Sequence, residues 1–106
     1  MITDKFKLPY YAVIFTSLLT DETEGYNESA QQMVTLAKEE EGFLGIESVR
    51  EEIGITVSYW NSLEAIINWK NNVEHTVIRE KGRATWYKKY QVRICKVERE
   101  YGFEKK

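Results

Sequence analysis

His75 and Arg79 are the residues of this chain best suited to acid–base chemistry on a bound molecule. His75 is the only histidine among 106 residues, and an imidazole with an ordinary pKa of about 6.5 exchanges a proton near neutral pH. Arg79 follows four residues later, so on a helix it shares a face with His75 and its guanidinium can hold an anionic oxygen. The three tryptophans of the chain, Trp60, Trp69 and Trp86, surround this pair in the sequence. Sites for small ligands are mainly apolar with a few polar groups, so we predict a pocket lined by these rings.

The same residues also have a structural interpretation. Large aromatic rings dominate protein cores, so each tryptophan can be a packing residue instead. His75 can be a surface or capping residue at a helix start, and Arg79 can form a surface ion pair with Glu74, Glu80 or a partner subunit. One histidine and one cysteine, Cys95, cannot build a standard structural zinc site, and the glycines lack the spacing of a nucleotide-binding loop.

Length and composition indicate a single globular domain over residues 1–106, with residues 1–9 as a loose leader. Hydrophobic residues make up 42% and charged residues 30% of the chain, as in ordinary soluble proteins. A net charge of −2 gives no reason to expect a nucleic-acid partner. No apolar run approaches the roughly 20 residues that span a bilayer, so no membrane association is expected. The single cysteine indicates a reducing compartment, and we expect the cytoplasm.

Hydrophobic periodicity predicts the elements that must position these side chains. The first apolar segment is apolar on both faces, which indicates a central strand. The next segment has its apolar residues at helical spacing, which indicates a helix. The predicted elements are a strand over Tyr10–Leu19, a helix over Tyr26–Ala37, strands over Phe43–Glu52 and Ile53–Trp60, helical segments over Ser62–Lys70 and Val73–Lys81, and a long strand over Trp86–Phe103. This order matches the split βαβ, ferredoxin-like α+β fold, with an antiparallel sheet and helices on one face.

Residues at the element ends predict three local features. Gly54 is expected to take a positive φ in a hairpin turn. Asn61 is expected to cap the second helix, with Glu64 three residues later completing a capping box. Gly82 is expected to end the helical segment that precedes it.

The last strand indicates a second copy of the chain. Its apolar residues occupy one face as far as Ile94 and the other face from Cys95 onward. A regular strand keeps its alternation, so this change predicts a β-bulge, or a strand that leaves its own sheet to cover another surface. In a chain of this length we expect that surface to belong to another copy, which makes a homodimer. Cys95 lies at the change and is expected to be buried and unreactive.

Two segments carry a resemblance to a known family. They are GFLGIESVREEIGITVSYWNSLEAIINWKNNVEH, residues 42–75, and GRATWYKKYQVRICKVEREYGF, residues 82–103. They resemble the antibiotic-biosynthesis-monooxygenase-like (ABM) domains of the dimeric α+β barrel superfamily. The resemblance implies a homodimer and an oxygenase that needs no cofactor and acts on a small aromatic or quinol-type compound.

One branch of this group degrades haem with a set of asparagine, tryptophan and histidine residues. Trp69 matches the tryptophan, but Arg79 stands at the histidine position, and Thr16 or Ser17 at that of the asparagine. No cofactor is therefore expected, and haem is disfavoured. Three hypotheses follow: an oxygenase that uses His75 and Arg79, a binder of a hydrophobic ligand such as haem without turnover, and a structural or regulatory dimer.

Overall fold

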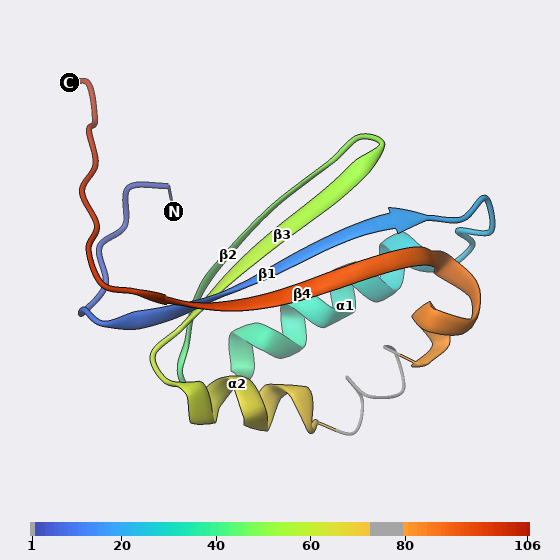
Figure 1. Ribbon diagram of the computed structural model, residues 1–106, viewed down its shortest axis with the longest axis horizontal. Coiled ribbons are helices and arrows are strands. Elements are labelled where there is room, and N and C mark those ends of the chain that lie inside the picture. The colour runs from blue at the N-terminus through green and yellow to red at the C-terminus, as the bar shows by residue number, and fades with distance from the viewer. Residues whose placement is uncertain (1, 73–79) are drawn as a thin grey trace.

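Four antiparallel strands form one sheet in the order β2-β3-β1-β4 (Figure 1). The computed structural model describes residues 2–72 and 80–106. Its strands are β1 (Tyr10–Leu19), β2 (Phe43–Arg50), β3 (Ile53–Trp60) and β4 (Tyr87–Val97), and its helices are α1 (Tyr26–Glu39), α2 (Leu63–Lys70) and the π-helix η1 (Gly82–Trp86). This order and topology confirm the predicted ferredoxin-like α+β fold.

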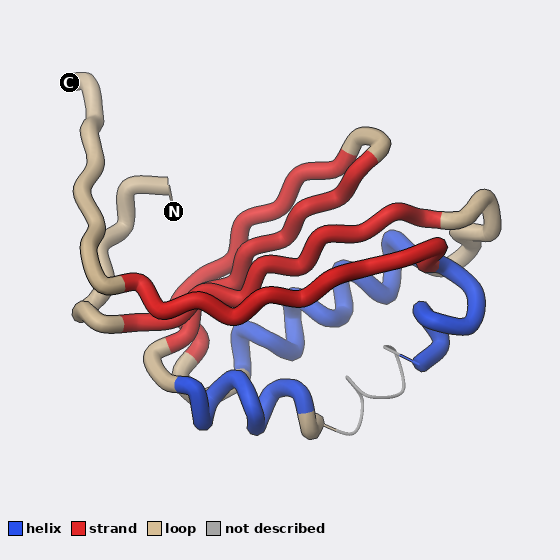
Figure 2. The backbone as a smooth tube through the Cα atoms, in the orientation of Figure 1, coloured by secondary structure: helices blue, strands red, loops and turns tan. Residues whose placement is uncertain are grey.

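β1 is the central strand, as its two apolar faces predict, because it pairs with both β3 and β4. Both α1 and α2 lie on the same side of the sheet, and no helix covers the other side in the part of the chain that is described (Figure 2). Cross-strand partners share a face, so the register of β1 assigns each side chain either to the helix side or to the open side.

The core lies between the sheet and the two helices. Trp60 at the end of β3 is buried together with Ala37 of α1 and with Ala65 and Ile66 of α2. Partly buried apolar side chains pack around this cluster: Tyr11, Val13, Phe43 and Trp69. The odd-numbered residues of β1 therefore face the helices, and its even-numbered residues face the open side.

Gly54 and Gly82 have different roles from those predicted. Gly54 is a strand residue paired with Arg50, and among the described glycines only Gly25 and Gly42 have a positive φ. Arg50 crosses Gly54 so closely that a Cβ there would lie 2.0 Å from a guanidinium nitrogen. Gly82 does not end the helical backbone, which continues as η1. A Cβ on Gly82 would lie 2.9 Å from the ring of Tyr87, so both glycines make room for a neighbouring side chain.

The cap of α2 lies one residue later than predicted. The hydroxyl of Ser62 accepts a hydrogen bond of 3.0 Å from the amide of Ala65. Asn61 instead donates its backbone amide to the carbonyl of Gly42 at 2.8 Å. Glu64 is then only two residues from the cap, so the predicted capping box does not form.

β4 is shorter than predicted and has no irregularity at Ile94–Cys95. Its register with β1 is continuous from Tyr10↔Val97 to Leu18↔Lys89, and the single shift lies beyond Leu18. Ile94 and Cys95 therefore lie on opposite faces of one regular strand, as neighbouring residues of any strand do. Cys95 is on the open side and is exposed, so the expectation of a buried thiol is wrong for the single chain.

The two terminal segments lie beside each other on the open side of the sheet (Figure 1). The backbone amide of Phe6 donates to the carboxylate of Glu100 at 3.1 Å, and the ring of Phe6 packs edge-on against Tyr10. Part of the predicted loose leader is therefore held against the sheet. Within the described residues no helix has the length and apolar character needed to cross a membrane.

Candidate functional site

Trp60 and Trp69 form a stacked pair between the sheet and α2. Their ring centroids are 6.0 Å apart at an interplanar angle of 29°. Trp60 has 0% of its surface exposed, and its indole N–H donates to the Ser58 hydroxyl at 2.9 Å. Phe43 packs edge-on against the same ring. Trp60 is therefore a core residue, and the partly exposed Trp69 is the member of the pair that a ligand can reach.

Trp86 lies at the other end of the sheet. It precedes β4 where Tyr87 pairs with Leu19 of β1, whereas Trp60 pairs with Tyr11. The distance along β1 between positions 11 and 19 is about 26 Å at roughly 3.3 Å per residue. The indole of Trp86 donates to the Glu24 carbonyl at 2.9 Å. The structure therefore brings together two of the three predicted tryptophans and places the third apart. His75 and Arg79 lie outside the described residues.

An apolar surface extends from the tryptophan pair along the helix side of β1 and β4. We call it the helix-side surface, and it consists of Val13, Phe15, Trp69, Val92 and Ile94. Val92 and Ile94 are the cross-strand partners of Phe15 and Val13, yet they remain 42% and 52% exposed. The helix contacts explain this exposure, because α1 packs mainly on β2 and α2 on β3. An aromatic molecule lying here would cover these side chains.

Tyrosines and an arginine continue this surface at the hairpin end of the sheet. Phe15 stacks on Tyr90 at 5.1 Å and contacts Tyr87 edge-on at 5.5 Å. Tyr87 in turn meets Tyr26, the first residue of α1. Burial is the main cause that raises the pKa of Tyr87, and the charge of Tyr26 and a hydrogen bond with Tyr26 add to this rise. The nearby Arg50 lowers the pKa and so opposes the shift. Tyr87 therefore remains a protonated hydrogen-bond donor at neutral pH.

Arg50 contributes a guanidinium to this region. Its guanidinium donates to the hydroxyl of the buried Ser17 and to the hydroxyl of Tyr26, the latter at 3.4 Å. It also lies over the Tyr26 ring, 5.5 Å from the centroid. We call Ser17, Tyr26, Arg50 and Tyr87 the Arg50 cluster. This cluster was not predicted from the sequence. The signal that could have revealed it is a glycine opposite an arginine in the predicted hairpin.

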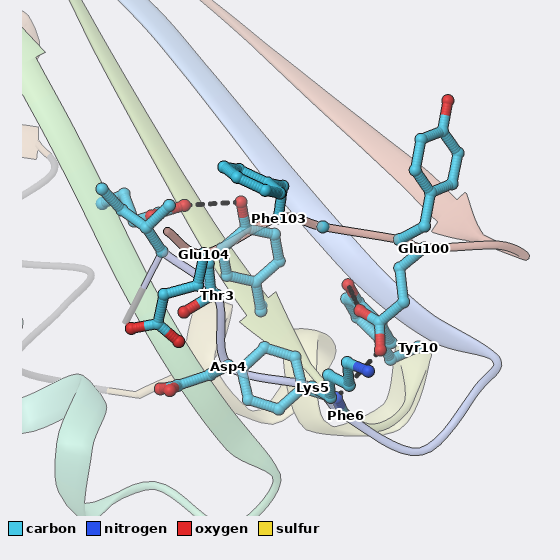
Figure 3. Close-up of a pocket in the computed structure, with 13 residues that line it drawn as sticks. Thr3, Asp4, Lys5, Phe6, Tyr10, Glu100, Phe103 and Glu104 are labelled. Carbon is cyan, nitrogen blue, oxygen red and sulfur yellow. Dashed lines mark hydrogen bonds between the residues drawn. The ribbon is translucent and has the colours of Figure 1, made fainter. Parts of the chain in front are cut away.

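A separate hollow of about 380 Å³ lies on the open side, between the two terminal segments (Figure 3). Its floor carries Tyr10 and Tyr59, whose hydroxyls donate to Glu100 at 2.6 Å and to Glu47 at 2.8 Å. Burial, followed by these hydrogen bonds, raises the pKa of both tyrosines to about 12. The other carboxylates of the lining are those of Asp4 and Glu104, and its one lysine is Lys5. The excess of carboxylates disfavours an anionic ligand, so this hollow does not suit a phenolate.

The haem-degrading set finds no support at the first strand. Ser17 is the candidate position on the helix side, and its hydroxyl already accepts a hydrogen bond from Arg50. A serine there provides no side-chain amide, so this position does not fit the haem-degrading set. In residues 2–72 and 80–106, no group of three or more histidine, cysteine, aspartate or glutamate side chains is placed to hold a metal ion.

A four-stranded antiparallel sheet with its helices on one side defines the class of this protein as an α+β, ferredoxin-like domain. The chain belongs to the antibiotic biosynthesis monooxygenase (ABM) family, whose model matches residues 9–81. It is 52% identical over 98 residues to the uncharacterised protein YqjZ of Bacillus subtilis (strain 168), an alignment that covers 91% of this chain and 86% of YqjZ.

Solved structures show the same fold at low sequence identity. Rv0793 from Mycobacterium tuberculosis superposes with a TM-score of 0.77 at 13% identity, covering 88% of this chain and 99% of Rv0793. SnoaB, a cofactor-independent oxygenase from Streptomyces nogalater, superposes with a TM-score of 0.71 at 9% identity, covering 81% of this chain and 90% of SnoaB.

Proposed function

We propose that the protein is a cofactor-independent monooxygenase that acts on a small aromatic or quinol-type compound. The observation that carries this proposal is the exposed apolar surface beside Trp69, where Val92 and Ile94 lie uncovered on the helix side of β4. Membership of the ABM family and the likeness to an oxygenase that works without a cofactor support the reaction type.

Such a reaction draws its electrons from the substrate. For an anthrone-type compound, a ring CH2 and O2 give a ring C=O and water. Two C–H bonds and the O–O bond break, one oxygen atom enters the product, and the substrate supplies all four electrons. The protein must deprotonate the substrate and stabilise the resulting oxyanion. We assign the first role to His75 and propose Arg79 as a donor for the second, with Trp69 against the aromatic rings.

Oxygen uptake tests the proposal. Purified protein without added cofactor is mixed with an anthrone- or quinol-type compound, and the uptake is compared in wild type, His75→Ala and Trp69→Ala. We expect the enzymatic rate to fall about 10²- to 10⁴-fold in His75→Ala, because a proton-transfer group is lost, and to fall also in Trp69→Ala, because the contact with the aromatic rings is lost. Ile67→Ala is the matched control, because it removes an exposed apolar side chain from the same helix. Equal rates in all four proteins and in buffer would reject the oxygenase.

Retention of a hydrophobic ligand without turnover is the second candidate. The observation that favours it is the full burial of Trp60, whose ring fills the space beside Trp69. A ligand would then contact the exposed apolar surface and not an enclosed cavity. A hemin titration followed by absorbance distinguishes the two candidates. We propose that no saturable Soret shift appears; a one-site shift lost in His75→Ala would make the protein a haem binder. If neither hemin nor an aromatic compound binds, the domain is a structural or regulatory dimer.

We also propose that the protein is a cytoplasmic homodimer that pairs through the open side of its sheet. Val49 and Ile53 on that side are 67% and 53% exposed, and Ile55 beside them is also exposed. Apolar residues in a row on an uncovered sheet favour burial against another surface. Sedimentation of wild type and Ile53→Lys tests this. A dimer that the substitution converts to monomer is expected, with Ile67→Lys on α2 as the control; a wild-type monomer at micromolar concentration would reject it.

A further inference from the structure

The guanidinium of Arg50 is held in place by neutral groups alone. Its hydrogen bonds go to the hydroxyl and the carbonyl of Ser17 and to the hydroxyl of Tyr26. No carboxylate of the described residues pairs with it. Arginine keeps its charge in proteins, and a partly buried cation gains most from an anionic partner. The cluster therefore has an unused capacity for one negative charge.

The position of the guanidinium depends on Gly54. Arg50 belongs to β2 and Ser17 to β1, so the side chain has to cross the intervening strand β3. It crosses at Gly54, where a Cβ would lie 2.0 Å from its terminal nitrogen and 2.1 Å from its central carbon. The absence of a side chain on β3 thus directs the guanidinium toward the helix side of β1, instead of into solvent beside its own strand.

The surroundings of Arg50 suit an aromatic oxyanion. The helix-side surface continues from Phe15 to Tyr87 and then to Tyr26 through ring contacts of 5.5 and 6.0 Å, and Tyr26 contacts the guanidinium. A second guanidinium in this region is that of Arg83, whose Nε donates to the hydroxyl of Tyr90 at 2.6 Å. Carboxylates are also present nearby, because Glu80 lies close to Arg83, and Glu24 and Glu28 line a hollow beside Trp86. The attraction for an oxyanion therefore comes from the guanidinium of Arg50 itself.

We infer that Arg50, positioned by Ser17, Tyr26 and the gap at Gly54, binds the anionic oxygen of an aromatic ligand, and that this site selects phenolates over neutral phenols. The inference rests on the proposed function, because it names the substrate group that the helix-side surface receives. Arg50 binds the phenolate oxygen, while the aromatic rings lie along Phe15 and the exposed residues of β4.

The test uses 4-nitrophenol as the probe, because the absorbance of its phenolate reports the protonation state of the bound molecule directly. Affinity and bound-state pKa are measured by titration across its pKa in wild type, Arg50→Gln, Arg50→Lys and Gly54→Ala. An adjacent arginine typically lowers the pKa of an acid by about 1 to 3 units. We therefore expect wild type to bind the phenolate about tenfold or more tightly than the phenol.

Arg50→Gln should abolish this preference, and Arg50→Lys should reduce it, because a lysine keeps the charge but not the guanidinium fork. Gly54→Ala should also reduce it while keeping Arg50, because the new Cβ displaces the guanidinium. Arg99→Gln is the charge-matched control, since Arg99 is exposed and follows β4 at its far end; the preference should persist there. Far-UV circular dichroism checks that each variant is folded.

Two outcomes overturn the inference: a wild type with no phenolate preference, or a preference that Arg50→Gln and Gly54→Ala both retain. The outcome of the oxygen-uptake experiment does not depend on the outcome of this one. A phenolate preference that depends on Arg50, without turnover by wild type, would reject the oxygenase and keep the binding site. Turnover that Arg50→Gln leaves unchanged, together with no phenolate preference in wild type, would reject the phenolate site at Arg50 and keep the oxygenase.

Discussion

Replacing Trp60 by alanine should destabilise the protein more than replacing Trp69. A buried tryptophan removes about 150–250 Å² from water, which corresponds to about 4–6 kcal/mol at roughly 25 cal/mol per Å². Trp60 is fully buried, with its N–H bonded to Ser58. We therefore expect Trp60→Ala to cost about 3–5 kcal/mol of unfolding free energy, a large part of the 5–15 kcal/mol that small domains typically have.

Trp69 is partly exposed, so its replacement should cost less than that of Trp60 by the same area argument. Urea denaturation followed by far-UV circular dichroism measures both values, because this signal does not depend on the tryptophans that are removed. The midpoint should fall with an unchanged m-value. A cost below about 1 kcal/mol for Trp60→Ala, or a larger cost for Trp69→Ala than for Trp60→Ala, would refute the assignment of Trp60 to the core and Trp69 to the ligand side.

Three further predictions concern the backbone and the tyrosines. Gly42→Ala should cost about 2 kcal/mol or more in urea unfolding, because φ is +91° and the added Cβ would lie 2.6 Å from two side-chain atoms; Gly102→Ala meets nothing within 4 Å and should be neutral. Ser62→Ala should cost about 1 kcal/mol of thermal stability through the lost helix cap, and an unchanged Tm would show that the cap is not needed. Since the pKa values of Tyr10 and Tyr59 rise from 10 to about 12 on folding, their contribution to stability is complete below pH 10 and is lost as the pH rises to 12. Tyrosinate absorbance and unfolding midpoints across that range measure this, and complete ionisation near pH 10 in the folded protein would contradict it.

The fold could be predicted from sequence because its signals are local and repeated. Alternating or continuous apolar runs gave every strand start within one residue, and the helical stripe from Tyr26 to Ala37 lies within α1. Such patterns follow directly from which faces are buried. The errors at Gly54 and Gly82 occurred where a neighbouring side chain occupies the space above a glycine. Gly54 reads as a turn residue until Arg50 is seen to cross it.

The candidate site could be predicted only in part. The pairing of Trp60 with Trp69 depends on the end of β3 and on the short helix α2, and both elements were predicted at the correct place in the sequence. Grouping Trp86 with them assumed that closeness in the chain means closeness in space, but the two ends of β1 separate it from Trp60. The Arg50 cluster draws one residue from each of β1, α1, β2 and β4, and no spacing in the sequence reveals contacts of that kind. The roles assigned to His75 and Arg79 stay predictions.

The measurement that tests the central claim most directly is the fate of isotopically labelled oxygen. Protein free of haem is incubated with an anthrone-type compound under 18O2 and a metal chelator, and the product is analysed by mass spectrometry. A monooxygenase that needs no cofactor should place one labelled oxygen atom in each product molecule, at a rate that falls in Trp69→Ala. Product without label, or labelled product formed only when hemin is added, would contradict the account.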